Sequence, residues 1–230
     1  MIDVHSHLLP FVDDGSQDEE LSYKNLKKAE EYGVTDMILT PHFRYGLFEV
    51  NGVEVEDRFF KFKQGAKERG IGVNLYLAQE VHYSRYMKED LKNDFYFLMK
   101  DNYVLTEFRF VTETDIPEAV YSLRYSGYNP IVAHFERYSY ATIEMAKQIK
   151  RFGGEIQINA TSIVGGYGSK IKKMAIKLLK EGLVDYVASD VHNDRPNDLK
   201  NAYPIVVKLI GQEETDNIFT FNAKKLLKEE

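Results

Sequence analysis

Cysteine is absent from the 230-residue sequence. Without it the chain can form no disulfide bond and no thiolate zinc site, and it cannot attack a substrate through a cysteine thiolate. No run of eighteen apolar residues occurs either, so we expect no transmembrane helix and no direct insertion into a membrane. The chain opens without a basic segment followed by an apolar one, so we expect no signal peptide and a cytoplasmic location.

The overall composition is that of a globular protein, with 43% hydrophobic and 29% charged residues. The formal net charge of −6 disfavours nucleic acid as a partner, because a protein that binds a phosphate backbone needs a basic surface. A chain of this length fits one domain, and the sequence contains no linker, repeat or low-complexity segment. We therefore expect residues 1–230 to form a single domain.

Short β-branched runs alternate with longer segments of helical periodicity along nearly the whole chain. Such alternation is typical of βαβ units and a parallel sheet. No glycine-rich dinucleotide fingerprint follows the first run, so an α/β barrel is favoured over an open doubly wound sheet. The seven predicted strands are Ile2–His5, Asp36–Thr40, Val73–Glu80, Tyr103–Glu107, Pro130–His134, Glu155–Asn159 and Val184–Ser189.

Capping residues and glycines mark the helix boundaries. The segment Ser16–Glu19 has a capping-box pattern that predicts a helix start, and Gly33 predicts the end of that helix. Pro117 is typical of a first helical turn. Two irregular stretches, Phe43–Asp57 and Ala160–Ser169, follow predicted strands, and in a barrel we expect both to overhang the catalytic face.

Histidines and carboxylates follow the predicted strands at their carboxyl ends. His5 and His7 end the first strand, and the two-residue period of a strand places both imidazoles on one side, where they can chelate one ion. Active sites of α/β barrels are built at this end of the strands. The other candidates at strand ends or in the loops that follow them are Asp13, Asp14, His42, Glu80, Glu107, His134, Asp190 and His192.

A lone histidine at a strand end is usually a hydrogen-bonded structural residue. Five histidines and several acids at the same end of successive strands have no packing explanation, because buried charges are costly unless they are paired or metal-bound. We therefore predict a multinuclear metal centre, and imidazole and carboxylate ligands without sulfur suit zinc, manganese or iron. His82 shares a strand face with Glu80 but matches no motif, and we do not expect it to be a ligand.

The order of these motifs along the chain is typical of a known family. Together the motifs resemble the polymerase-and-histidinol-phosphatase (PHP) superfamily and, within it, the bacterial capsular-polysaccharide tyrosine phosphatases. The opening His-x-His is shared with amidohydrolases, whereas the later motifs in this order are specific, and the resemblance covers essentially the whole chain. The motifs are His5-Ser6-His7, Asp13-Asp14-Gly15, Thr40-Pro41-His42, Glu80, Glu107-Phe108, Ala133-His134-Phe135-Glu136-Arg137 and Ala188-Ser189-Asp190-Val191-His192-Asn193.

The resemblance implies a distorted (β/α)7 TIM-like barrel of PHP type with three divalent metal ions. Manganese is the first choice, with iron or zinc as alternatives. The residues His5, His7, Glu80 and Asp190 would hold the first ion. Glu80 would bridge to the second ion, which Glu107 and His134 complete. The third ion would be held by Asp14, His42 and His192.

Two positions need comment, one because the choice of ligand rests on the family pattern and one because the sequence departs from that pattern. The sequence leaves open whether Asp13 or Asp14 is the ligand, and the family pattern favours Asp14. The family's usual His-Pro-Glu-Arg is replaced here by a motif with Phe135 in the second position, so we expect a local change of the backbone with the chemistry retained.

The charge balance of this centre suits phosphate. Four carboxylates and three divalent ions sum to about +2, which favours a phosphate dianion, and metal ions can turn a bound water into a hydroxide nucleophile near neutral pH. Arg137 and Arg195 resemble the family's phosphate clamps, and the alternative for each is a solvated surface arginine. A tyrosine leaving group has a pKa near 10 and needs little acid assistance.

The predicted function is a manganese-dependent protein-tyrosine phosphatase. Its partner would be the tyrosine-rich tail of a bacterial tyrosine kinase that controls capsule or exopolysaccharide synthesis. The alternatives are another PHP phosphoesterase, such as a histidinol-phosphate phosphatase or an exonuclease, and a metal-binding scaffold without turnover. The loop after His42 contains Arg44, Tyr45 and Phe48, which either bind a tyrosine-bearing peptide or belong to a mobile loop whose aromatic residues have no binding role. The glycine-rich Gly165–Gly168 is weak evidence of phosphate binding.

Overall fold

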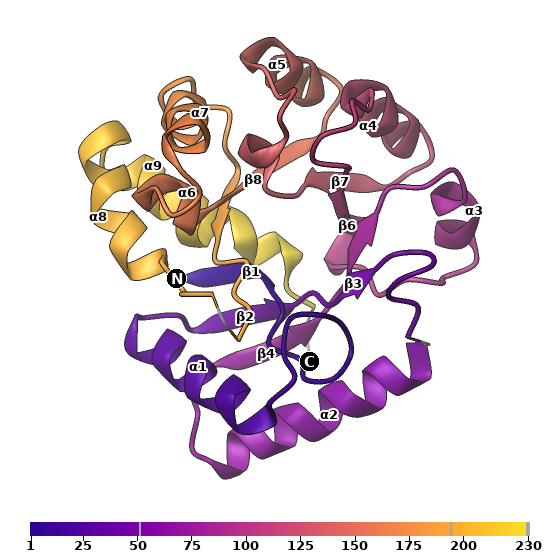
Figure 1. The fold of residues 1–230 in the computed structure, drawn as a ribbon, viewed down its shortest axis with the longest axis vertical. Coiled ribbons are helices and arrows are strands. Elements are labelled where there is room, and N and C mark those ends of the chain that lie inside the picture. Colours follow the sequence, from indigo (N-terminus) through magenta and orange to yellow (C-terminus); the bar gives the residue numbers. More distant parts are fainter. Residues whose placement is uncertain (51, 194, 229–230) are drawn as a thin grey trace.

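Parallel strands form a curled sheet, and helices lie around its outside (Figure 1). The computed structural model describes residues 1–50, 52–193 and 195–228. One set of strands pairs in the order β1-β2-β4, and the other in the order β3-β5-β6-β7-β8-β9. These strands are β1 (Ile2–Ser6), β2 (Asp36–Leu39), β3 (His42–Phe43), β4 (Asn74–Leu77), β5 (Glu80–His82), β6 (Tyr103–Glu107), β7 (Asn129–Val132), β8 (Glu155–Asn159) and β9 (Tyr186–Ala188).

The two sets join into a distorted barrel. The pair β2 and β4 continues as the pair β3 and β5, because Ala78 N donates to Leu39 O at 3.0 Å and Glu80 N donates to Pro41 O at 3.2 Å. At the other edge, an isolated parallel bridge between Ser6 and Val191 brings β1 to the end of β9. Two of the positions around the barrel are therefore filled by interrupted strands, and the expected distorted seven-position barrel is confirmed.

The interruptions correct the strand predictions. The predicted strand Val73–Glu80 is two strands, because Gln79 N leaves the ladder and donates to Phe97 O at 2.9 Å. The short β3 lies where the irregular stretch Phe43–Asp57 was expected to begin, and it is separated from β2 by Pro41, which has no N–H to donate.

Helices fill the connections between strands. The first helix, α1, is capped by Asp18, whose Oδ1 accepts a hydrogen bond from Leu21 N at 3.1 Å, so the capping-box prediction centred on Ser16 was displaced by two residues. Pro117 lies in the first turn of its helix, as expected. The helices are α1 (Glu19–Glu31), α2 (Gly52–Glu68), α3 (Met87–Lys92), α4 (Ile116–Tyr125), α5 (Ile143–Arg151), α6 (Ala160–Val164), α7 (Ser169–Lys180), α8 (Leu199–Ile210) and α9 (Gln212–Asp216).

Helix also enters both stretches that were expected to be irregular, since α2 begins at Gly52 and α6 begins at Ala160. Among the described residues, no helix has the length and apolar character needed to cross a membrane.

The C-terminal segment anchors the end of the barrel opposite the metal-ligand candidates. Short helical turns at Asn217–Phe221 and Asn222–Leu226 bring Leu226 into a cluster with strand side chains such as Val4 and Leu105. Lys225 Nζ lies 2.6 Å from a carboxylate oxygen of Glu155, at the amino end of β8. The C-terminal segment thus covers the amino ends of the strands, and the candidate ligands lie at the opposite, carboxyl ends.

Candidate metal centre

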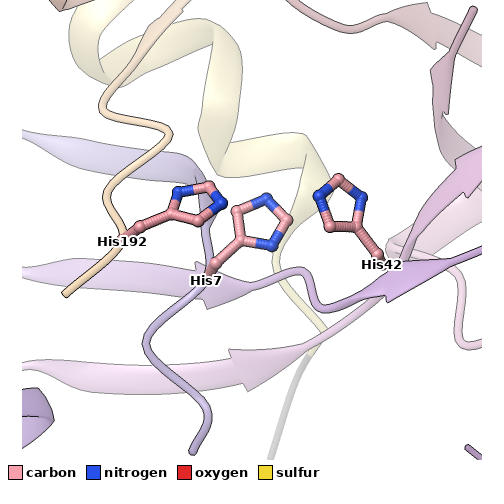
Figure 2. A group of neighbouring side chains, drawn as sticks. All are labelled: His7, His42 and His192. Carbon is pink, nitrogen blue, oxygen red and sulfur yellow. The ribbon is translucent and has the colours of Figure 1, made fainter. Parts of the chain in front are cut away.

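Three histidines from separate segments converge at the carboxyl ends of the strands (Figure 2). His7 follows β1, His42 begins β3 and His192 follows β9. The ring of His7 lies between the other two, with centroid distances of 4.3 Å to His42 and 4.4 Å to His192. One ring nitrogen of each lies within 4.8 Å of the others, so the three could share a metal ion.

A buried carboxylate, Glu80, lies at the centre of the histidines. Its Oε2 is 3.3 Å from Nε2 of both His5 and His7 and 2.8 Å from Nδ1 of His42, while its Oε1 is 2.9 Å from Nε2 of His134. Burial alone would raise the pKa of this carboxyl, but His5 and His42 outweigh it and hold the pKa well below its ordinary value. Oε2 nevertheless has no hydrogen-bond partner, so a buried anionic oxygen is surrounded by ring nitrogens that do not donate to it with good geometry.

The protonation pattern of His5 and His7 makes the same place suitable for a cation. Gln157 Oε1 accepts from His134 N at 2.8 Å, which identifies it as the oxygen, so His5 Nδ1 at 3.1 Å must be the donor to it. His7 Nδ1 likewise donates to Asp13 Oδ2 at 2.8 Å. In the neutral rings both Nε2 atoms then carry lone pairs, and they face each other at 3.0 Å. A divalent metal fits such a set of lone pairs.

Asp190 connects this set to an arginine. Its backbone is left-handed, with φ 51°, and its Oδ1 lies 3.7 Å from Nε2 of His5 and 3.6 Å from Nε2 of His7. Its Oδ2 accepts hydrogen bonds from Arg137 Nη1 at 3.0 Å and Asn159 Nδ2 at 2.7 Å. Burial would raise the pKa of this carboxyl, but the imidazole of His5 and its neighbours hold it below its ordinary range. One oxygen therefore faces the histidines while the other faces Arg137.

The two adjacent acids of the first loop have different surroundings. Asp13 is buried, and its oxygens accept from His7 Nδ1, from His42 N at 2.9 Å and from Gly15 N at 2.9 Å. Asp14 is exposed, lines the cleft and has its Oδ1 3.7 Å from Nε2 of His42. The hydrogen bonds of Asp13 orient His7 from behind, which leaves Asp14 as the freer of the two carboxylates.

His192 keeps a nitrogen available. Its Nδ1 lies 3.0 Å from Asp190 O, the geometry of a hydrogen bond that the ring donates. Burial, together with the charge of His7, lowers the pKa of His192 to about 3, so the ring is neutral near pH 7. The Nε2 lone pair of His192 is then free for a cation.

Glu107 lies at the edge of the same cluster, at the end of β6. Its Oε1 is 3.7 Å from His134 Nε2, and its Oε2 is 3.0 Å from His82 Nδ1. One oxygen of Glu107 can also join His42 and Glu80 within 4.8 Å. His82 thus contacts the Glu107 oxygen that does not face His134.

Two amides on β8 take part in the site although their sequence pattern was not singled out. Gln157 binds His5 and also donates from Nε2 to Asn159 Oδ1 at 2.8 Å, and Asn159 in turn donates to Asp190. A chain of hydrogen bonds therefore joins a histidine of the first strand to the carboxylate after the last. The alternation Gln-Ile-Asn at a strand end was the available signal, since it places two amides on one face.

A cleft of about 160 Å³ opens beside the cluster, and three arginines line it. Arg137 is held by Asp190 and is 19% exposed at its side chain. Arg195 is looser, with 36% exposure and Nη1 3.9 Å from Asp190 Oδ2. Arg44 reaches the cleft from the loop after β3. The cleft therefore combines the histidine and carboxylate cluster with positive groups on its walls.

Comparison with known proteins supports this chemistry. A family model described as capsular polysaccharide synthesis, CpsB/CapC, matches residues 1–228. The chain is 34% identical to the tyrosine-protein phosphatase CpsB of Streptococcus agalactiae, over 99% of this chain and 98% of that relative. It is 28% identical to the tyrosine-protein phosphatase YwqE of Bacillus subtilis, over 99% and 92% of the two chains.

Solved structures agree with the sequence comparisons. A structure from the pair YwqE of Bacillus subtilis and CpsB of Streptococcus pneumoniae, described as metal-dependent tyrosine phosphatases, matches with a TM-score of 0.89 and 27% identity. The match covers 99% of this chain and 94% of that one. A histidinol phosphate phosphatase from Lactococcus lactis matches with a TM-score of 0.61 and 15% identity over 92% and 95% of the chains, which is a likeness of fold alone.

Proposed function

The chain belongs to the capsular polysaccharide synthesis CpsB/CapC family, and we propose that it hydrolyses phosphotyrosine in a protein at a centre of three divalent metal ions. In class it is a metal-dependent phosphomonoester hydrolase, like the tyrosine phosphatases it resembles. The observation that carries the proposal is the position of Glu80 Oε2, which lies unpartnered among ring nitrogens beside an arginine-lined cleft.

The proposed ligand sets follow the family pattern. The first ion would be held by His5, His7, Glu80 and Asp190, the second by Glu80, Glu107 and His134, and the third by Asp14, His42 and His192. The cluster supports the first set in that His5, His7 and Asp190 offer atoms within 4.8 Å of one another. A second group within this distance, His42, Glu80 and Glu107, combines proposed ligands of the second and third ions. The groups overlap, since His7 also joins His42 and His192. Such overlap is what ligands shared between neighbouring ions require.

Charge gives this site its preference for phosphate. The four proposed carboxylates and three divalent ions leave about +2, which suits a phosphate dianion in an otherwise acidic protein. When bound, the ions would lower the pKa of water and so supply the nucleophile that the chain, without cysteine, lacks. Manganese is the proposed metal, with iron and zinc as alternatives that the same nitrogen and oxygen ligands accept.

The arginines would hold the phosphoryl oxygens. Arg137 donates a hydrogen bond from Nη1 to Asp190 and also lines the cleft, so its remaining N–H donors can reach an anion there. Arg195 lines the same cleft and can close on the phosphate from the more exposed side. Planar guanidinium groups match the paired oxygens of a phosphoryl group, and they stabilise the charge that develops as the bond to the tyrosine oxygen breaks.

Aromatic side chains give the cleft affinity for a phenyl ring. Phe48 stacks on His42 at a centroid distance of 5.6 Å, Phe110 packs at a tilt against His134 at 5.2 Å, and both line the cleft. The tyrosine leaving group departs as a phenolate of pKa near 10, so no dedicated acid is needed. The proposed protein substrate is the tyrosine-rich tail of a bacterial tyrosine kinase. Such kinases use ATP, which makes the cytoplasm the proposed location.

A side-by-side assay tests the proposal. The manganese-loaded protein would be given a phosphotyrosine peptide, histidinol phosphate and single-stranded DNA at equal concentrations. We expect turnover of the peptide to dominate. Preferential hydrolysis of histidinol phosphate or DNA would assign the chain to another PHP activity, and no turnover of any substrate with metal bound would indicate a scaffold.

A further inference from the structure

The guanidinium group of Arg137 lies over two aromatic rings. Its Cζ lies 4.7 Å from the ring centroid of Phe110 and 4.5 Å from that of Tyr167. Phe110 follows β6, whereas Tyr167 belongs to the glycine-rich segment between α6 and α7. We propose that Phe110 and Tyr167 are positioning residues that hold Arg137 in the orientation needed to bind the phosphoryl group.

The geometry leaves Arg137 little freedom. An arginine side chain loses rotamer entropy when it is fixed, so an unsupported arginine binds an anion less well. Here the Phe110 and Tyr167 rings lie within cation–π distance of the guanidinium, and Asp190 accepts from Nη1 at 3.0 Å. Because Arg137 also lines the cleft, the donors not bound to Asp190 are the ones available to an oxyanion.

The glycine-rich segment is shaped to place Tyr167 rather than to bind phosphate. Gly165 and Gly168 have left-handed φ values of 104° and 91°, and a Cβ at Gly166 would lie 2.6 Å from Thr161 Cγ2. The backbone N–H groups of Gly165 and Gly166 both donate to Thr161 O, at 3.1 and 2.9 Å, and Gly168 N donates to Gly165 O at 3.0 Å. These amides are therefore occupied within the turn and do not form an anion cradle.

Phe110 connects Arg137 to the proposed metal centre. Phe110 packs against His134, with a centroid distance of 5.2 Å, and against Tyr138, at 5.7 Å. His134 faces Glu80 with its Nε2. The position of Arg137 is thus coupled through one ring to a proposed ligand and through Asp190 to another. Arg195 is 36% exposed and is held less closely, so the two arginines are not equivalent.

The inference rests on the proposed function, and binding of inorganic phosphate tests it without requiring turnover. Calorimetry on the manganese-loaded protein would compare wild type with Tyr167→Leu, Tyr167→Phe and Phe110→Leu, alongside metal content and circular dichroism. We expect Tyr167→Leu and Phe110→Leu to weaken phosphate binding roughly three- to tenfold with unchanged metal content, and Tyr167→Phe to retain most of the affinity. Tyr125→Leu, at a residue 85% exposed and outside the cleft, is the matched control.

A double-mutant cycle separates positioning from general packing. In an Arg137→Ala background the Tyr167→Leu change should have no further effect on the dissociation constant for phosphate, since there is no guanidinium left to position. An equal loss in both backgrounds would overturn the inference, as would wild-type affinity in Tyr167→Leu or equal losses in Tyr167→Leu and Tyr167→Phe. If phosphate binds as expected but no phosphotyrosine peptide is hydrolysed, the proposed function fails while the positioning role stands.

Discussion

Asp13 Oδ2 accepts the Nδ1 proton of His7 at 2.8 Å, on the side of the ring opposite the nitrogen that faces Glu80. This contact fixes the tautomer of His7 and makes Nε2 the lone-pair atom. It also gives the two neighbouring acids of the first loop separate roles, because Asp13 is buried behind the ring and Asp14 lies in the cleft. A carboxylate behind a metal-binding imidazole typically raises the affinity for the ion.

We expect Asp13→Asn to weaken manganese binding about 10- to 100-fold, because the amide is a poorer partner for the His7 proton. Titration of metal-free protein with manganese, followed by metal analysis, measures this directly. Asp14→Asn serves as the comparison and should reduce the number of ions bound at saturation, since the residue is a proposed direct ligand. Unchanged manganese affinity in Asp13→Asn would contradict the orienting role.

Arg137 and Arg195 should respond differently to replacement by lysine. Arg137→Lys cannot bind Asp190 with one edge and phosphate with the other, so we expect kcat/KM on a phosphotyrosine peptide to fall about 100-fold. Arg195→Lys keeps a mobile positive charge and should fall about tenfold or less. Steady-state kinetics on the two variants gives the comparison. Equal losses would show that the contact of Arg137 with Asp190 has no bearing on catalysis.

Gln157 is expected to matter for stability as well as for the site. Gln157→Ala removes the acceptor for both His5 Nδ1 and His134 N, and two buried donors left unpaired cost about 2–4 kcal/mol in the free energy of unfolding. Urea denaturation of the metal-free protein measures the change. The control is Gln64→Ala on the exposed face of α2, which should change stability by less than about 0.5 kcal/mol. Equal changes would argue against the network.

Metal binding should oppose protonation. In the metal-free protein burial lowers the pKa values of His5 and His7, but nearby carboxylates (Glu80 for His5, Asp13 for His7) outweigh it and raise both above the ordinary 6.5. Protons on these rings must leave before an ion binds, so manganese affinity should decrease as pH falls from 8 to 6. Titrations across this range, with proton release measured in two buffers, would show it. An affinity independent of pH would contradict the assignment of these rings as ligands.

The same shifts have a consequence for folding without metal. A histidine whose folded pKa is raised stabilises the protein below its unfolded pKa, and that stability is lost as pH rises through the folded value. After chelation, the free energy of unfolding should therefore decline as pH increases above about 6.5, and added manganese should restore it. Urea midpoints with and without metal across this range test the sign. A midpoint that rises with pH in the chelated protein would be the opposite result.

Much of this arrangement could be predicted from the sequence because it depends on local patterns. The alternation of strands and helices predicted the barrel, and the family resemblance drawn from the motifs is confirmed. Placement of ligand types at strand ends predicted that His7, His42 and His192 would meet, and the structure brings them together. Their division among three ions remains a prediction.

The features that could not be predicted depend on contacts between distant segments. Gln79 breaks a predicted strand through hydrogen bonds with Phe97, a partner that no local pattern identifies. Gln157 gains its role only when β8 pairs with β7 and the Gln157 side chain reaches His5 of β1. The sequence does not distinguish Tyr167 from the other tyrosines, because its contact with Arg137 forms only in the folded chain. Periodicity indicates which face of an element a side chain occupies, but not which neighbour it meets there.

The parallel bridge between Ser6 and Val191 closes the barrel between its first and last strands. Each side of that seam carries proposed ligands, with His5 and His7 in or just after β1 and Asp190 and His192 just after β9, and the two pairs are separated by some 180 residues of chain. An ion held across the seam would therefore link the first strand of the barrel to the segment that follows the last strand. During synthesis, the first two ligands emerge early but must wait for nearly the whole chain before the set is complete, so high-affinity metal uptake reports that the ring of strands has closed.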